Sequence, residues 1–144
     1  MQTMDAQQPV GLTRDAGFEM GIRRTLNVSP DEVWRFMFSE RGRQIWLGDV
    51  VAGAFLPDSL WVTADGISGQ LRVLKPDSHF RMTWQARQWA NVSTLQVRVI
   101  PNKGRTTLSF HQEKLADAAQ REMMLAHWER VLLQLAEALL PKQA

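Results

Sequence analysis

DAAQREMMLAHWERVLLQLAEALL, residues 117–140, is the longest stretch of helical periodicity in this sequence. Asp117 is suited to cap its first turn with Gln120 three positions later, and Pro141 follows its last residue. The pattern predicts a helix of about 23 residues, roughly 35 Å long, which is enough to cross a whole sheet. Its apolar stripe comprises Met124, Leu125, Trp128, Val131, Leu132, Leu135, Ala136 and Leu139. A stripe this broad must be buried against a large apolar surface.

The sequence between Val50 and Gln112 predicts that surface. Turn clusters separate short segments in which apolar and polar residues alternate, as they do in strands with one buried face. The clusters lie at residues 57–59, 64–66, 76–78 and 102–104. Phe80, Met82 and Trp84, for example, share one face of a strand whose other face is polar. We therefore expect an antiparallel sheet with one face packed on the long helix and the other in solvent.

One more strand and two short helices are expected before this sheet. Apolar and polar residues alternate from residue 20 to 28, and the sequence SPDE at residues 29–32 has the pattern of a capping box with proline in the first turn. The first helix should end near Phe38. Ser39 is suited to cap the second, and Gly48 to end it. The predicted class is α+β.

Length and composition limit the classes of protein that need to be considered. A chain of 144 residues with 44% hydrophobic and 22% charged residues is typical of one globular domain. We expect a flexible tail over residues 1–18 and a single domain over residues 19–141. The chain has no cysteine, which excludes disulfides and thiolate metal sites and favours the reducing cytoplasm. The longest apolar run, near residues 50–57, is too short to insert across a membrane.

Five short strings occur in order along the chain: RTLNVSP at residues 24–30, EVW at 32–34, IWLG at 45–48, MTWQ at 82–85 and HWERVL at 127–132. Taken together they resemble the homologues of the activator of the heat-shock protein 90 ATPase. That family belongs to the START-like, or SRPBCC, superfamily of helix-grip folds. The resemblance covers nearly the whole chain from Glu19 onward.

The resemblance implies a helix-grip fold, in which a curved antiparallel sheet wraps around a long C-terminal helix and two short helices follow the first strand. It also implies a cavity between sheet and helix, where superfamily members bind lipids, sterols, polyketides and plant hormones. The alternative partner is a chaperone or another protein, and the chain can also form a homodimer under this resemblance. The eukaryotic co-chaperone docks through a separate N-terminal domain for which this chain has no room, so direct activation of the chaperone is not the expected role.

Aromatic and thioether side chains at predicted inward positions are the candidate ligand-binding residues. The sequence has six Trp and six Phe but no Tyr, which suits an apolar cavity. The alternative is that these side chains pack on one another as an ordinary core. The inward set is Phe36, Trp46, Met82, Trp84, Phe110, Met124 and Trp128. Trp61 and Trp89 lie near turns and are candidates for the rim of the opening.

Arg24 is the candidate for binding the polar end of a ligand. Strand alternation places it on the same face as Ile22 and Leu26, hence inward. A buried guanidinium needs a carboxylate, several carbonyls or a ligand anion as its partner. The alternative is that the side chain extends to the edge of the sheet or pairs with an internal glutamate.

Four arginines are expected on the outward faces of successive strands: Arg72, Arg81, Arg98 and Arg105. A basic stripe of this kind can contact an acidic partner or a phosphate backbone. Proteins that bind single-stranded nucleic acid interleave such charges with aromatic residues, which this face lacks. We therefore expect a solvated face that discourages aggregation, and no nucleic-acid partner.

Catalysis finds little support in the sequence. The three histidines, His79, His111 and His127, are dispersed, and His111 with Glu113 on one strand face supplies only two metal ligands. No motif of a hydrolase, zinc protease, P-loop or dinucleotide site occurs. No cofactor or metal is expected. The sequence favours a binding module for a small hydrophobic or amphipathic ligand, and its alternatives are a co-chaperone-like interaction domain or a cyclase- or hydrolase-type enzyme.

Overall fold

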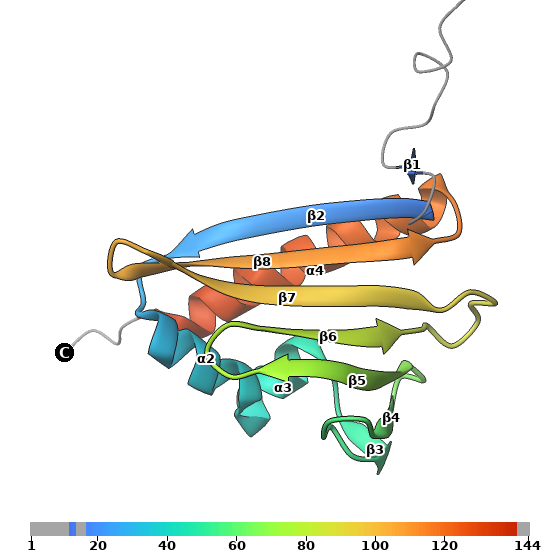
Figure 1. The fold of residues 1–144 in the computed structure, drawn as a ribbon, viewed down its shortest axis with the longest axis horizontal. Coiled ribbons are helices and arrows are strands. Elements are labelled where there is room, and N and C mark those ends of the chain that lie inside the picture. The colour runs from blue at the N-terminus through green and yellow to red at the C-terminus, as the bar shows by residue number, and fades with distance from the viewer. Residues whose placement is uncertain (1–11, 14–16, 141–144) are drawn as a thin grey trace, which may run out of the picture.

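The computed structural model describes residues 12–13 and 17–140, which form one curved sheet and three helices (Figure 1). The strands are β1 (Leu12–Thr13), β2 (Gly17–Leu26), β3 (Val50–Gly53), β4 (Leu60–Thr63), β5 (Ser68–Lys75), β6 (His79–Trp84), β7 (Ser93–Asn102) and β8 (Arg105–Leu115). The helices are α2 (Pro30–Phe38), α3 (Glu40–Trp46) and α4 (Ala118–Leu139).

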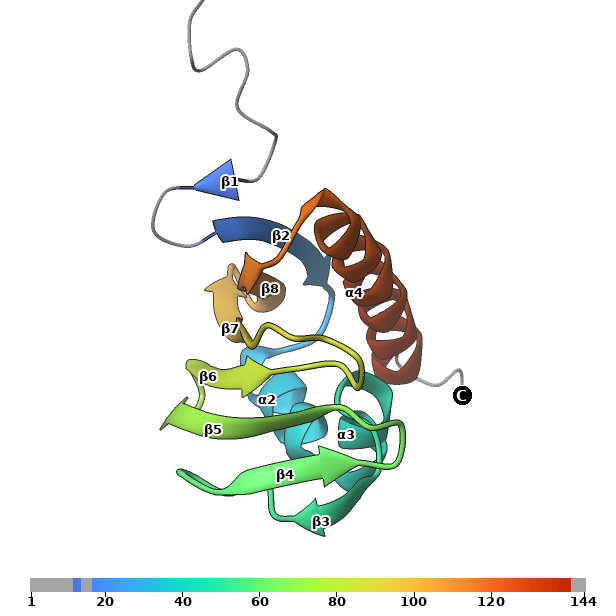
Figure 2. The ribbon, with the colours of Figure 1, turned by 90° about the vertical axis from the view of Figure 1, so that its right-hand side faces the viewer.

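The sheet has the order β1-β2-β8-β7-β6-β5-β4-β3, and every pair in it is antiparallel. All three helices lie on one face, with α4 beside β2 and β8 and the two short helices beneath the other half of the sheet (Figure 2). The opposite face is turned to solvent. This arrangement confirms the predicted α+β helix-grip fold, with two short helices after the first long strand.

The ends of the chain differ in detail from the prediction. β2 begins at Gly17, so residues 17 and 18 belong to the sheet rather than to the expected tail, and β1 pairs with them. The rest of that tail, residues 1–11 and 14–16, lies outside the described residues, as does Pro141. Among the described helices, none combines the length and apolar character that crossing a membrane requires.

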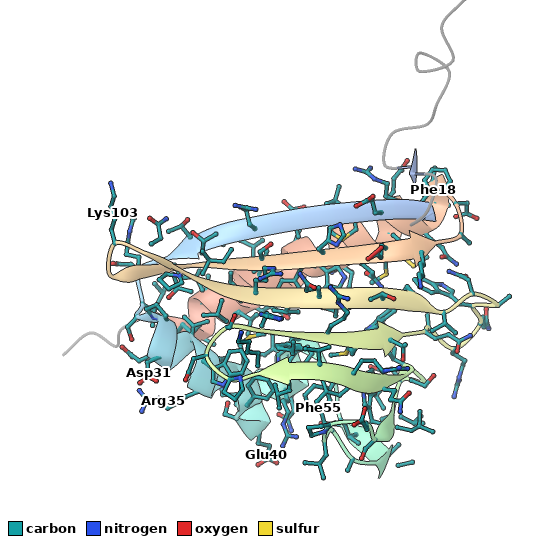
Figure 3. The ribbon with its side chains drawn as sticks, viewed as in Figure 1. Phe18, Asp31, Arg35, Glu40, Phe55 and Lys103 are labelled. Atoms are coloured by element: carbon teal, nitrogen blue, oxygen red, sulfur yellow. The ribbon has the colours of Figure 1, made fainter. Side chains whose placement is uncertain are left out.

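The caps of the helices are those that the sequence predicts. The Ser29 hydroxyl accepts the Glu32 amide at 3.3 Å at the start of α2, and Ser39 accepts the Gly42 amide at 3.0 Å at the start of α3. Asp117 accepts the Gln120 amide at 2.8 Å at the start of α4. Each of these side chains satisfies a backbone donor that the first helical turn leaves free. On the solvent side of α2, Asp31 and Arg35 form an exposed ion pair (Figure 3).

Large rings fill the interior in two groups. Beneath β4–β6, Trp46, Phe55 and Phe80 contact one another with ring centroids 5.0 to 6.3 Å apart. Beneath β7 and β8, Phe110 stacks on Trp128 of α4 at 4.8 Å. The edge-to-face and stacked geometries are those that aromatic pairs favour. The inner face of the sheet is therefore packed with side chains along most of its length.

Candidate functional site

Most of the predicted ligand-binding residues are parts of this packed interior. Trp61, Met82, Phe110 and Trp128 are 0% exposed, and Met124 is 1% exposed. Trp46 is also buried, and its indole nitrogen donates to the Met37 carbonyl at 2.7 Å. Trp61 therefore belongs to the core and does not form a rim, contrary to the prediction. Phe36 is half-buried on α2, with the Arg41 guanidinium 6.0 Å from its ring centroid.

Arg24 is exposed, so the buried position predicted for it is wrong. In the register of the sheet, Arg24 lies opposite Leu108, which is 0% exposed. Arg24 is therefore on the inner face of the sheet, as the strand alternation predicts. β1 covers β2 only at Gly17 and Phe18, and Arg24 lies near the opposite end of the same strand. The side chain thus reaches solvent at the open edge of the sheet, which is the alternative that sequence alternation leaves open.

An open groove of about 510 Å³ lies where α4 passes the end of β6 and the loop that follows it. Trp84 and Trp89 line it from the sheet side, and Met123 and Met124 line it from α4. Three predicted site residues, Trp84, Trp89 and Met124, therefore meet there. The other lining residues were not predicted: Asp65, Ile67, Ala86, Arg87, Gln88, Met123, His127 and Arg130. Most of these residues lie on loops, where neither helical nor strand periodicity predicts which side chains face inward.

The apolar part of the groove is built from aromatic contacts. The rings of Trp84 and Trp89 meet edge to face with centroids 5.2 Å apart, and the His127 ring lies 6.2 Å from Trp84. Met123 is 55% exposed beside them, which is high for an apolar side chain of this size. Flat rings next to an exposed thioether form the kind of adaptable apolar wall that binds small molecules.

Hydrogen bonds fix the loop that carries Trp89. The side-chain Nε2 of Gln85 donates to the Trp89 carbonyl at 2.7 Å, and the backbones of Ser68 and Gln85 pair at 2.9 and 3.0 Å. Further along the loop, Asn91 and Gln120 exchange side-chain hydrogen bonds at 3.0 Å and so join the loop to the start of α4. The groove therefore has a preformed wall, which lowers the entropy cost of binding.

A buried polar chain lies behind the groove. The Trp128 indole nitrogen donates to Gln112 Oε1 at 2.7 Å, and Gln112 Nε2 donates to Ser93 Oγ at 2.9 Å. Ser93 in turn donates to the Trp84 carbonyl at 2.5 Å. Gln112 is 0% exposed, so each group in the chain needs these partners. The chain links α4 to β6, β7 and β8 and holds the floor of the groove in place.

Charged groups line the outer part of the groove. Arg87 and Arg130 face a single carboxylate, Asp65, and among the described residues neither arginine forms an ion pair. Burial lowers the pKa of His127 below its ordinary value, and the charge of Arg130 lowers it further. His127 is therefore neutral near pH 7 and can donate and accept hydrogen bonds. The groove combines an apolar wall with an excess of positive charge.

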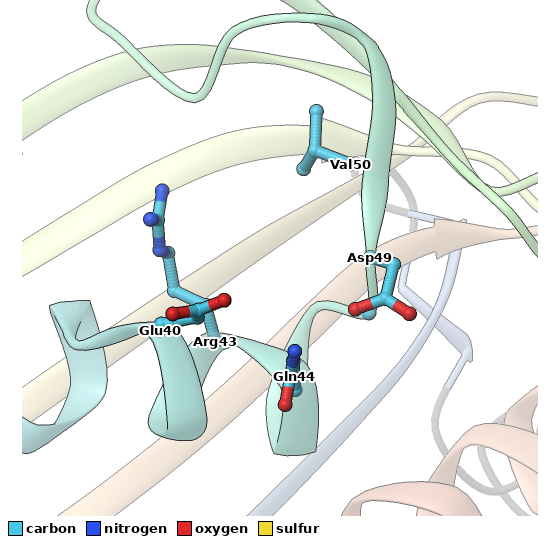
Figure 4. Close-up of a pocket in the computed structure, with 6 residues that line it drawn as sticks. Glu40, Arg43, Gln44, Asp49 and Val50 are labelled. Atoms are coloured by element: carbon cyan, nitrogen blue, oxygen red, sulfur yellow. The ribbon is translucent and has the colours of Figure 1, made fainter.

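A smaller pocket of about 200 Å³ lies between α3 and the start of β3 (Figure 4). Glu40, Arg43 and Gln44 reach it from α3, and Asp49 and Val50 come from the chain that follows. Arg43 Nε is buried there without a hydrogen-bond partner. Val50 is the only large apolar residue among those that line this pocket. Nowhere in the described part of the chain do three His, Asp or Glu side chains lie close enough together to hold a metal ion.

Comparison with known proteins agrees with the fold. Crystal structures of CalU16 from Micromonospora echinospora and of CV1439 from Chromobacterium violaceum are 16% and 20% identical to this chain, with TM-scores of 0.76 and 0.70. The alignments cover 88% and 86% of this chain, and 76% and 98% of those chains. The solution structure of the Aha1 dimer from Colwellia psychrerythraea is 15% identical over 84% of this chain and 95% of that one, with a TM-score of 0.67.

No curated protein matches the sequence closely. Identities this low establish a common fold and nothing finer. The sequence pattern of the family described as activator of Hsp90 ATPase homolog 1-like protein matches residues 27–140, which is most of the chain. The chain belongs to that family.

Proposed function

We propose that the protein binds a small amphipathic molecule with an anionic group in the groove between α4 and the loop after β6. One observation carries the proposal: the half-exposed Met123 lies beside Trp84 and Trp89, with the unpaired Arg87 and Arg130 at the same groove. An apolar body would cover the rings and the thioether. Its anionic end would pair with the guanidinium groups, which provide planar donors for carboxylate, sulfonate or phosphate.

The energetics favour such a ligand over a purely apolar one. Each square ångström of apolar surface removed from water contributes about 25 cal/mol, from which the cost of immobilising the ligand must be subtracted. The groove is open, so apolar contact alone covers only part of a ligand. Charge-assisted hydrogen bonds to Arg87 and Arg130 would supply both additional affinity and orientation.

A fluorescence titration with anilinonaphthalene sulfonate, which has aromatic rings and one sulfonate, tests the proposal. Met123 and Leu133 are both exposed apolar residues of α4, at 55% and 47%, but only Met123 lines the groove. Met123→Ser should weaken binding roughly tenfold, as the loss of one apolar contact surface predicts, while Leu133→Ser should not change it. Equal effects of the two substitutions would contradict the proposal.

The anionic part of the proposal has its own control. Arg130→Gln should weaken binding of the sulfonate but leave the binding of neutral phenylnaphthylamine unchanged. Arg105→Gln removes the same charge from an exposed site that is not part of the groove and should change neither. Native mass spectrometry of protein from its own host would then identify the natural ligand as a reproducible mass excess.

The free edge of the sheet favours a second candidate, a protein-interaction function. β3 is the last strand, and its sequence VVAG has no charge or proline of the kind that usually protects an edge. Val51 and the neighbouring Leu60 are 65% and 67% exposed. A partner strand would add to β3, and the partner would be a second copy of the chain or a chaperone of the Hsp90 class.

Light scattering after size exclusion tests this candidate. Association of the wild-type protein that Val51→Lys abolishes would support strand addition between copies. Co-elution with an Hsp90-type chaperone, again lost in Val51→Lys, would support the chaperone. A wild-type monomer that does not bind the chaperone would exclude both.

A further inference from the structure

The outer face of the sheet carries a row of cationic side chains that the groove does not involve. In this row Arg23 of β2 lies opposite Ser109 of β8, and Ser109 lies opposite Arg98 of β7. The row continues through His79 of β6 to Lys75 of β5. Neighbouring strands are about 4.8 Å apart, so the two arginines start roughly 10 Å from each other with Ser109 between them. Both side chains are long enough to reach an anion above Ser109.

A hollow lies beside this row, and Gly21, which has no side chain, forms part of its wall. Its volume is about 500 Å³, and Gly21, Arg23, Gln96, Arg98, Ser109 and His111 contribute to its lining. Gly21 and His111 lie opposite each other in the next row of the sheet, followed by Gln96. This face is turned toward the viewer in Figure 3, away from α4. The hollow is thus separate from the groove.

The polar groups around the hollow are mostly donors. Gln96 Oε1 already accepts hydrogen bonds from Arg81 Nη2 and Nε at 2.7 and 3.1 Å. The side-chain amide nitrogen of Gln96 is therefore the group that can donate to a ligand. His111 Nε2 lies 2.7 Å from the Glu19 carboxylate, so this acidic group is already engaged. Among the described residues, neither Arg23 nor Arg98 forms an ion pair.

The behaviour of His79 is consistent with a positive potential along the row. Desolvation lowers the pKa of His79, and the charges of Arg98, Lys75 and Arg81 lower it further. These are the same cations that surround the hollow or continue its row. A positive potential that disfavours a protonated histidine favours a bound anion for the same reason.

We propose that this hollow binds a phosphate monoester, with Arg23 and Arg98 contacting the phosphate oxygens from two sides and the Ser109 hydroxyl donating between them. A phosphate dianion has enough acceptor oxygens for two guanidinium groups, a hydroxyl and an amide, whereas a carboxylate has two. The hollow is much larger than an inorganic phosphate. The remaining space holds part of the molecule that carries the phosphate.

NMR titrations at constant ionic strength test the charge requirement. Inorganic phosphate, glycerol phosphate and a short phosphoserine peptide are each added to the full chain, with acetate as the reference anion. Phosphates should shift the amide signals of Gly21 and Ser109, and acetate should not. Arg23→Gln and Arg98→Gln should each weaken binding roughly tenfold, as the loss of a charge-assisted hydrogen bond predicts, and Arg105→Gln should not. A preference for the peptide or for glycerol phosphate would identify which of the two carries the phosphate.

A second variant tests the shape of the site while every charge is kept. A Cβ at Gly21 would meet its nearest neighbour, His111 Cδ2, at 3.7 Å, which is an ordinary contact. Gly21→Val, with a residue that strands favour, should therefore be tolerated and should occupy part of the hollow. Phosphate binding should weaken in Gly21→Val although the protein stays folded. Unchanged affinity in this variant, or equal shifts with acetate, would overturn the proposal. So would an oligonucleotide that binds more tightly than any monoester and responds equally to Arg105→Gln.

Discussion

Trp128 lies at the centre of the contact between α4 and the sheet. It stacks on Phe110 and is the donor at one end of the chain that passes through Gln112 to Ser93. Neither the stacking nor the hydrogen bond can be predicted from the sequence, in which Trp128 is one of several aromatic residues expected to face inward. The residue is therefore better understood as part of the floor that supports the groove than as a contact for the ligand.

Trp128→Phe should lower the free energy of unfolding by at least about 2 kcal/mol. Phenylalanine keeps part of the stacking but leaves the buried Gln112 Oε1 without a donor and a space beside it. Gln112→Leu alone should also destabilise, because it leaves the indole N–H unpaired. Urea unfolding of the double variant should show less loss than the two single losses combined. Strict additivity would mean that the hydrogen bond contributes little.

His127 predicts a dependence of stability on pH. Burial and then the charge of Arg130 lower its pKa in the folded protein below the ordinary value of 6.5. As the pH falls through that value, the unfolded chain takes up a proton that the folded protein does not, so stability falls. His79 acts in the same direction.

His127→Gln should therefore lose less stability than the wild type between about pH 8 and pH 5, a range that lies above most carboxyl titrations. His79→Gln, on the other face of the sheet, should also reduce the pH dependence of stability. The effects of the two substitutions should be additive. Denaturant unfolding at several pH values measures these slopes. A slope in His127→Gln equal to that of the wild type would contradict the assignment.

At the scale of elements, α2 and α3 meet unusually closely. The Ser39 hydroxyl donates to the Phe36 carbonyl at 2.6 Å and accepts the Gly42 amide, so α3 turns back across the end of α2. A Cβ on Gly42 would lie 1.8 Å from the same carbonyl oxygen. The two helices can pack in this way only because position 42 has no side chain.

Gly42→Ala should destabilise the protein by at least about 2 kcal/mol, the cost of forcing two backbones apart. This result reverses the usual effect, since alanine in a helix is normally better than glycine by about 1 kcal/mol. Gln44→Ala, at an exposed position of the same helix, is the control and should be close to neutral. Thermal unfolding distinguishes the two. A higher melting temperature for Gly42→Ala would show that the helices can separate at little cost.

The elements also show what could be predicted from sequence. Caps at Ser29, Ser39 and Asp117, and the strands between turn clusters, follow from local rules and were predicted correctly. Arg24 was placed on the correct face but wrongly buried, because exposure at a sheet edge depends on what neighbours the strand.

The groove could be predicted only in part, since Arg87 and Asp65 lie on connections and reach it through tertiary packing. Whether large rings enclose a cavity or fill one depends on volumes that alternation does not encode.

At the scale of the whole molecule, the groove and the outer hollow lie on opposite sides of one packed layer. Between them the interior consists of fully buried side chains such as Phe110 and Met82. Coupling between distant sites is carried by elements that have two discrete arrangements, and a closely packed layer resists such rearrangement. Packed layers are about 10 Å thick, which exceeds the screening length of about 8 Å for exposed charges at physiological salt.

The two sites should therefore act independently. Gly21→Val should bind anilinonaphthalene sulfonate as the wild type does, and Met123→Ser should keep its affinity for phosphate, each to within about twofold. Two titrations on these two variants provide the measurement. If Gly21→Val also weakened the sulfonate, this probe would be binding in the outer hollow, and the groove would lose its evidence. If the two sites were instead coupled through the protein, saturating either site would change the affinity of the other. The factor would be the same in both directions, because coupling between sites is reciprocal.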